Sequence, residues 1–378
     1  MSAAGPSQGA KAPLGGSVAY EVASVGVRRH PRDVLLGAQS TATSLPVCDH
    51  YCGVEARMRK SLALQAEMSQ EFGACVFDVT LDCEDGAPVG GEKDHANMVA
   101  ALANQAQEAS KTVVNGIPVR VAARVHPVDH PAFGQDVDII VGGAAASLCH
   151  LMIPKIETVE EVERAVQWVD RVAIKAGRTN PLPLHVLIES PAAVHRVFEI
   201  AAHPRVQSIS FGLMDFVSSH GGAIPASAMG IHAGQDSTEL DQFSHPLVLR
   251  AKLEIASACH AHGKVPAHCV VTEFSDIAAV QAAATRASRA LGYTRMWSIH
   301  PSQIRPILEA FAPQAHEIEL ATNIMTAAAQ ADWAPISFGG KLHDRASYRY
   351  FWHVLERAHQ TGRHLPDEAR AYFSAKCH

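Results

Sequence analysis

The chain has 378 residues, of which 47% are hydrophobic and 19% are charged, and its formal net charge is −6. This composition can supply a large apolar core, and it excludes a predominantly disordered chain. The sequence contains no cluster of lysine and arginine and no apolar stretch of transmembrane length, so we expect neither nucleic acid nor membrane as a partner.

Residues 1–30 are predicted to form a flexible N-terminal arm, because the stretch "MSAAGPSQGAKAPLGG" is rich in Gly, Ala, Pro and Ser. The arm lacks the apolar segment of a secretory signal. The eight cysteines are scattered and stand mostly in apolar surroundings. We therefore expect a cytoplasmic protein with reduced thiols.

Apolar strand candidates alternate with helical patterns along most of the chain, which predicts an α/β protein. This alternation indicates a TIM (β/α)8 barrel over residues 31–312, followed by a C-terminal helical extension or lid at 313–378. The alternative, an open doubly wound sheet, is disfavoured because the chain has no Gly-rich dinucleotide turn. The strands are expected at 33–39, 74–83, 119–127, 147–155, 184–190, 208–215, 265–271 and 295–301.

The segment "CDHYC", Cys48 to Cys52, resembles half of a zinc site. No second Cys/His pair follows at the spacing of a zinc finger, so a structural zinc site is disfavoured.

Ionisable residues gather where the predicted strands end, whereas the bodies of the strands read as apolar. In a barrel of this kind the active site lies at the C-terminal ends of the strands. This distribution therefore predicts an enzyme site there. The residues concerned are Asp82, Glu84, Asp85, Arg124, His126, Lys155, Glu157, Glu189, Asp215, His268, Cys269 and His300.

Glu189 and Asp215 end neighbouring strands in this prediction, so their carboxylates should stand side by side. Two oxygen ligands without a thiolate or imidazole suit a hard cation, Mg²⁺, with Mn²⁺ as an alternative. The competing interpretation is that each acid caps a helix or lies free on the surface.

Arg124 should point into the opening of the barrel at the C-terminal ends of the strands, which we call the mouth. A guanidinium there can neutralise an acid and offer two donors to a substrate oxygen. A plain salt bridge to Glu84 or Asp85 is the other interpretation, and the two are compatible. Lys155 and Glu157 are expected to pair with each other, and His300 is expected to be a hydrogen-bonded structural histidine.

Six segments, in order, resemble motifs of the HpcH/HpaI aldolase and citrate lyase β-subunit superfamily, which includes malyl-CoA lyases. The segments are "LDCEDGAPVGGEK", "VRVAARVHP", "MIPKIET", "LIESPAAV", "SISFGLMDF" and "LGYTRMWSIHPSQI". The resemblance spans about residues 55–360. The chain departs from the pattern at His126, at "AHCVVTEF", at Arg295 and Met296, and in "VLLGAQSTATSLP".

The resemblance implies a Mg²⁺-dependent barrel enzyme that makes or breaks carbon–carbon bonds. It implies that Glu189 and Asp215 are the metal ligands, that Arg124 binds substrate, and that Glu84 and Asp85 orient Arg124 and metal-bound water. It also implies a trimer or hexamer in which an acid of the C-terminal segment reaches a neighbour's site. Asp344, in "GKLHDRASY", is the candidate for that acid, and an N-cap role for Asp344 is the alternative.

The favoured function is therefore a lyase that cleaves or forms a β-hydroxyacyl-CoA or a hydroxy-oxo acid through an enolate and releases an α-oxo acid. Two alternatives stay open at this point. One is a thioester hydrolase of the malyl-CoA type on the same metal site, and the other is a non-catalytic barrel that binds an acyl-CoA or organic acid.

Overall fold

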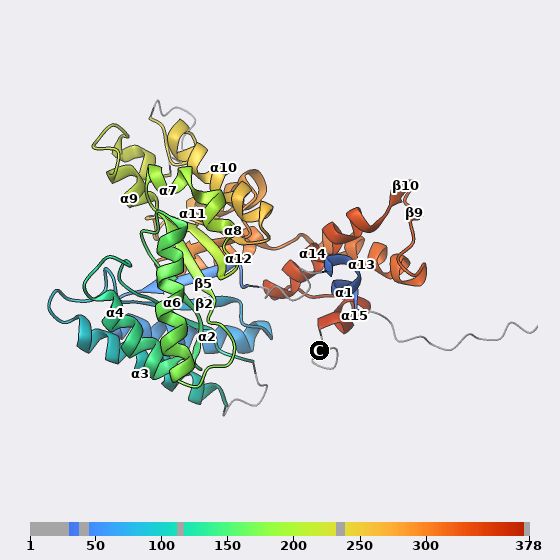
Figure 1. The fold of residues 1–378 in the computed structure, drawn as a ribbon. Coiled ribbons are helices and arrows are strands. Elements are labelled where there is room, and N and C mark those ends of the chain that lie inside the picture. Colours follow the sequence, from blue (N-terminus) through green and yellow to red (C-terminus); the bar gives the residue numbers. More distant parts are fainter. Residues whose placement is uncertain (1–29, 38–44, 112–116, 232–238, 374–378) are drawn as a thin grey trace, which may run out of the picture.

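The computed structural model describes residues 30–37, 45–111, 117–231 and 239–373. Within these ranges eight parallel strands close a barrel in chain order, which confirms the predicted TIM barrel (Figure 1). The strands are β1 (Cys48–Cys52), β2 (Phe77–Asp82), β3 (Val121–Arg124), β4 (Leu148–Ile153), β5 (Leu184–Ile188), β6 (Val206–Phe211), β7 (Val265–His268) and β8 (Arg295–Ser298).

Helices cover the outside of the barrel because the outward-facing strand residues are apolar. Val79 and Leu81 of β2, for example, are fully buried in the main core together with Met58 and Leu102 from the surrounding helices. The principal helices are α2 (Glu55–Phe72), α3 (Glu92–Lys111), α4 (Phe133–Asp136), α6 (Val159–Lys175), α7 (Pro191–His195), α8 (Val197–Ala202), α9 (Leu213–Ser218), α10 (Pro246–Ala261), α11 (Ile277–Thr285) and α12 (Ile304–Phe311).

The predicted first strand at 33–39 is wrong. Residues Pro31–Leu36 form a helix, α1, and Leu35 packs in a second core with Tyr348 and Trp352 of the C-terminal helices. The first barrel strand is Cys48–Cys52 instead, paired with β2 and β8. The segment that resembled half of a zinc site is thus a barrel strand, and both of its cysteines are free.

The strand bodies are not apolar throughout, contrary to the prediction, because several inward-facing positions are polar. Arg295 of β8 is fully buried and its Nη2 lies 2.9 Å from Asp49 and 2.7 Å from Asp78. Arg120 Nε lies 2.5 Å from the other oxygen of Asp78. His185 bonds the hydroxyls of two serines of β6, each at 2.7 Å. Arg295, which departs from the family pattern, therefore belongs to the interior of the barrel.

This polar layer includes two groups whose ligand atoms lie within 4.8 Å of one another: Asp49 with His150 and His185, and Asp78 with Cys149 and His150. The charges in it already balance, because Arg120 and Arg295 face the two aspartates. Burial also lowers the pKa of His150 to about 4, so the imidazole adds no positive charge to this balance. We therefore interpret the layer as a support beneath the mouth and not as a cation site.

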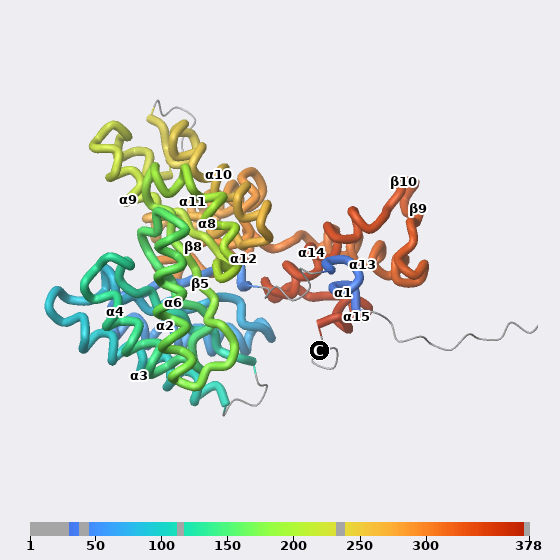
Figure 2. Tube along the Cα trace, viewed as in Figure 1, coloured from blue at the N-terminus to red at the C-terminus, as the bar shows by residue number. Residues whose placement is uncertain are grey.

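A second hydrophobic core lies beside the barrel and joins both ends of the described chain (Figures 1 and 2). It is built from α1, α13 (Ala315–Gln330), α14 (Arg345–Gln360) and α15 (Asp367–Arg370), with a short hairpin of β9 (Ile336–Phe338) and β10 (Lys341–His343). Figure 2 shows the blue helix α1 among the red helices. The domain boundary at residue 312 stays a prediction.

No helix in the described ranges combines the length and the hydropathy needed to span a bilayer.

Candidate active site

The loops after β1 and β2 approach each other at a pair of glycines. A Cβ atom on Gly86 would lie 2.5 Å from the Cα of Gly53, which is closer than side chains tolerate. Glycine is thus required at both positions. This contact brings the end of β1 against the acidic segment that follows β2.

Arg124 ends β3 and is almost fully buried by three carboxylates of that acidic segment. Its Nε donates to Asp82 Oδ1 at 2.5 Å, and its Nη2 donates to Asp85 Oδ2 at 2.7 Å. Its Nη1 forms an ion pair with Glu84 Oε2 at 2.8 Å. The salt bridges expected from the sequence are present, with Asp82 as an additional partner.

Tyr51 of β1 completes the surroundings of Arg124 and was not predicted. Its hydroxyl accepts a hydrogen bond from Arg124 Nη2 at 2.9 Å, and the guanidinium carbon lies 4.7 Å from the ring centroid. The ring stacks on Trp297 of β8. Both Nη2 hydrogens and the Nε hydrogen are therefore in use, and Nη1 also faces Glu84, which leaves one Nη1 hydrogen for a substrate oxygen.

Asp85 is the partner of Arg124 that can leave. Its side chain is 68% exposed, whereas those of Asp82 and Glu84 are buried. Movement of Asp85 would free one Nη2 hydrogen beside Nη1. Arg124 can therefore offer two donors to a substrate oxygen, as the sequence predicts, only when Asp85 gives up its hydrogen bond.

Glu189 follows β5 and is a buried carboxylate with little compensating charge. Its Oε2 accepts the Lys155 backbone N–H at 2.7 Å. Burial and the neighbouring charges of Glu84 and Asp215 raise the pKa of Glu189 to about 8. A Cβ atom on Gly212 would lie 2.3 Å from Glu189 Oε1, so only glycine leaves room for this side chain.

Glu189 and Asp215 line one cavity of about 260 Å³, as their neighbouring strands predicted. Lys155, Glu157 and Ser190 also line it. The two acids offer only oxygen donors, and the raised pKa of Glu189 reflects its burial and the neighbouring negative charges of Glu84 and Asp215. This donor set fits a Mg²⁺ ion, which prefers carboxylates and keeps positions for water and substrate.

Lys155 pairs with Glu84 and not with Glu157, contrary to expectation. Its Nζ lies 2.6 Å from Glu84 Oε1 and 4.0 Å from Asp215 Oδ1. Glu84 therefore bridges Lys155 and Arg124, and connects the acidic segment after β2 to the cavity.

The other residues predicted at the strand ends, and Asp344 of the C-terminal segment, are buried or have structural partners. His300 caps a short helical turn and bonds Ser302, as predicted for a structural histidine. His126 bonds the buried Asp136 at 2.6 Å, and His268 and Cys269 are fully buried. Asp344 caps α14 by accepting from the N–H groups of Ala346 and Ser347.

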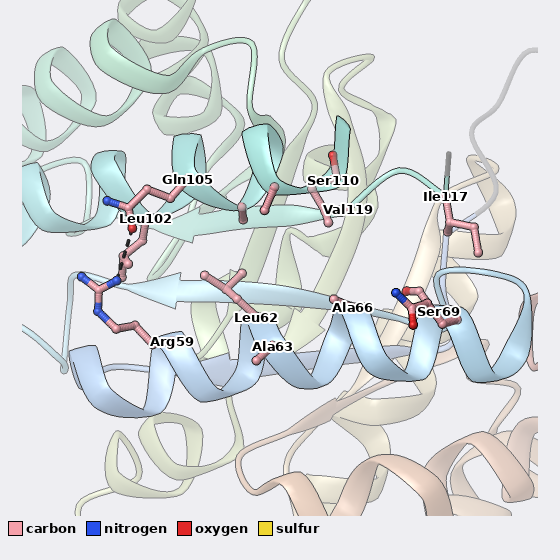
Figure 3. A pocket seen from close by; sticks show the side chains of 13 residues that line it. Arg59, Leu62, Ala63, Ala66, Ser69, Leu102, Gln105, Ser110, Ile117 and Val119 are labelled. Atoms are coloured by element: carbon pink, nitrogen blue, oxygen red, sulfur yellow. Dashed lines mark hydrogen bonds between the residues drawn. The ribbon is translucent and has the colours of Figure 1, made fainter. Parts of the chain in front are cut away.

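A different cavity, of about 290 Å³, lies between α2 and α3 on the outside of the barrel (Figure 3). Its lining is mostly alanine, leucine and other apolar side chains, and Arg59 at its edge donates to Gln105 at 3.2 Å. It lacks the convergent ionisable groups that the barrel mouth has.

Comparison with known proteins identifies close counterparts of this chain. The model of the HpcH/HpaI aldolase/citrate lyase family matches residues 61–301. An L-malyl-CoA/β-methylmalyl-CoA lyase from Cereibacter sphaeroides is 31% identical over 305 residues, which cover 76% of this chain and 90% of that relative.

Solved structures show the same fold. A citrate lyase from Burkholderia xenovorans superposes with a TM-score of 0.71 at 45% identity, covering 92% of this chain and 100% of that one. CitE from Mycobacterium tuberculosis, solved with magnesium, acetoacetate and coenzyme A, superposes with a TM-score of 0.56 at 18% identity, covering 83% of this chain and 98% of that one.

Proposed function

The chain belongs to the HpcH/HpaI aldolase/citrate lyase family, and we propose that it is a Mg²⁺-dependent lyase that cleaves or forms a β-hydroxyacyl-CoA or a hydroxy-oxo acid. The observation that carries this proposal is the arrangement at the mouth of the barrel. Arg124 forms an ion pair with Glu84, and Glu84 also forms an ion pair with Lys155. Lys155 lies near Asp215 and lines the same cavity as Glu189 and Asp215.

Each group at the mouth has a role in this reaction. Glu189 and Asp215 would hold Mg²⁺, with Mn²⁺ as an alternative, and the bound ion would supply Lewis acidity toward the oxo acid. Arg124 would stabilise negative charge on the enolate oxygen through Nη1. Asp82, Glu84 and Tyr51 fix the guanidinium, so little reorganisation accompanies the reaction.

The relatives support a CoA ester as the substrate. The relative from Cereibacter sphaeroides is named for lyase activity on malyl-CoA and β-methylmalyl-CoA, and CitE was solved with coenzyme A. A carboxylate would move the proton between the hydroxyl of such a substrate and the enolate carbon. Asp85, which is exposed and bonded to Arg124, would be a candidate for this role.

We expect oxo acid to form when the purified protein is incubated with Mg²⁺ and a panel of β-hydroxyacyl-CoAs and free hydroxy-oxo acids. Oxo acid and free thiol are measured in parallel, with chelated protein as the control. Lysis of a CoA ester gives oxo acid and a shorter acyl-CoA without free thiol, whereas hydrolysis gives free thiol without oxo acid. Release of thiol alone would replace the lyase by a hydrolase, and binding without turnover would indicate a non-catalytic barrel.

We also propose that the protein is a trimer or hexamer in which Asp344 serves the site of a neighbouring subunit. The helices α13, α14 and α15 and the hairpin of β9 and β10 form a C-terminal lobe, and Asp344 follows β10. Figure 1 shows this lobe on the side of the barrel away from α4 and α9, which are the helices that follow β3 and β6. Because the hairpin stands on that side, we propose that Asp344, the residue that follows it, reaches an active site only in a second subunit.

Mixing two inactive variants, Asp344→Ala and Asp215→Ala, is expected to restore part of the activity. Some mixed sites would then combine an intact Asp215 with an intact Asp344 from the neighbour. The activity of the mixture is compared with that of each variant alone, while subunit exchange is followed by mass spectrometry of differently labelled chains. Exchange without recovered activity would leave Asp344 as the N-cap of α14 only.

A further inference from the structure

Lys252 of α10 is a fully buried amine that the proposed reaction does not use. Its Nζ donates to Gln242 Oε1 at 2.8 Å and lies 4.1 Å from the centroid of the Phe243 ring. Within the described ranges no carboxylate oxygen lies at salt-bridge distance from this nitrogen. A buried lysine without an acid partner is costly as a cation, so the site favours a neutral amine.

The thiol of Cys269, one residue after β7, shares the partner of this amine. Its Sγ donates to the same Oε1 of Gln242 at 3.2 Å. Like Lys252, Cys269 is fully buried. One amide oxygen thus holds an amine nitrogen and a thiol sulfur next to each other.

The protonation states suit a reaction between the two groups. Burial lowers the pKa of Lys252 to about 8, so roughly a tenth of the amine is uncharged at pH 7. Burial also raises the pKa of the Cys269 thiol, which keeps it protonated. A neutral amine carries the free lone pair that a nucleophile needs.

A cavity lies next to Phe243, one of the side chains that contact Lys252. A cavity of about 350 Å³ lies against Phe243, with Ile231, Ala279 and Ala283 in its lining. The Phe243 ring stands between this cavity and the amine, since it contributes to the cavity wall and contacts Lys252 Nζ. Dioxygen is small and uncharged, so entering the buried apolar surroundings of the pair costs it less free energy than it would cost a charged oxidant.

We propose that dioxygen converts Lys252 and Cys269 into a covalent N–O–S bridge. One oxygen atom joins Nζ to Sγ. The other oxygen atom leaves as water together with one hydrogen from the amine and one from the thiol. Dioxygen thereby accepts four electrons, and no further reductant or oxidant is needed. The bridge would tie α10 to the end of β7, and a thiol reductant would reverse it.

The proposal is tested on the purified full chain, kept either anaerobically or in air-saturated buffer. Bridging is expected to raise the intact mass by about 14 Da, because one oxygen is gained and two hydrogens are lost, whereas a sulfenic acid adds about 16 Da. Proteolysis should yield one cross-linked species that joins the peptides of Lys252 and Cys269, and dithiothreitol should restore the original mass.

Matched variants separate the bridge from other oxidation. Cys269→Ser should abolish the increase in mass. Cys48→Ser should leave the increase unchanged, because Cys48 is another buried thiol but its charged neighbours are aspartates and an arginine. Lys252→Met removes the amine while keeping an unbranched side chain, and it should also abolish the mass gain. The bridge should raise the unfolding temperature of oxidised wild type above that of reduced wild type, with no such difference in Cys269→Ser.

Two results would overturn the proposal. One is an unchanged mass in folded wild-type protein after prolonged exposure to air. The other is a mass gain that persists in folded Lys252→Met, because the oxygen would then reside on sulfur alone.

Discussion

Replacing Arg124 by lysine is expected to lower kcat/KM by about a hundredfold or more, the loss typical of removing a donor that stabilises developing charge. A lysine keeps the charge but offers its hydrogens from one nitrogen atom. It cannot bond Asp82, Asp85 and Tyr51 at once and still present a donor where Nη1 stands. Steady-state kinetics with the substrate identified in the panel gives the ratio.

Arg120→Lys is the matched control for this prediction. Arg120 pairs with the buried Asp78 just before the same strand, at the opposite end of the barrel from the mouth. If the loss arises from weakened packing, both variants should lose activity in parallel with their unfolding temperatures. Near-normal turnover of Arg124→Lys would reduce Arg124 to a structural ion pair.

Replacing Glu189 by glutamine or Asp215 by asparagine is expected to abolish metal-dependent activity while the fold is retained. A Mg²⁺ site with two protein carboxylates loses half of its ligand charge in each variant. Glu189 is repelled by Glu84 and Asp215 in the structure, so its neutral replacement removes an unfavourable interaction. Calorimetric titration with Mg²⁺ measures binding, and thermal unfolding with and without the ion measures the linked stabilisation.

Glu157→Gln serves as the control, because Glu157 lines the same cavity and carries the same charge. It should bind Mg²⁺ and turn over substrate nearly as the wild type does. A crystal structure with Mg²⁺ in which the carboxylates of Glu189 and Asp215 are more than about 6 Å apart would contradict shared ligation, since Mg–O distances are about 2.1 Å.

The barrel was predictable because its outward-facing strand residues pack under helices and are apolar in sequence. The first strand was missed for a physical reason. β1 buries Asp49 and His50, whose polar groups are bonded by Thr80, Ser61 and Ser298 inside the protein, so no apolar run marks it. The apolar residues near Leu35 instead face the second core.

The acids at the strand ends were predictable, but their pairing was not. Chain order places Asp82, Glu84 and Asp85 near Arg124, yet only the loop geometry sends Glu84 toward Lys155 as well. Tyr51 could not be assigned to the site while its strand was misplaced. A tyrosine in a short segment between two cysteines, followed by Gly53, was the available signal.

The second core has a consequence for the order in which the molecule is assembled. Leu35 precedes the barrel in the chain, whereas its partners Tyr348 and Trp352 follow it. During synthesis the barrel strands emerge before α14, so α1 has no partner surface until the barrel has left the ribosome. Closing so long a loop costs only slightly more entropy than closing a short one. We therefore expect the second core, which joins α1 to α13, α14 and α15, to assemble after the barrel.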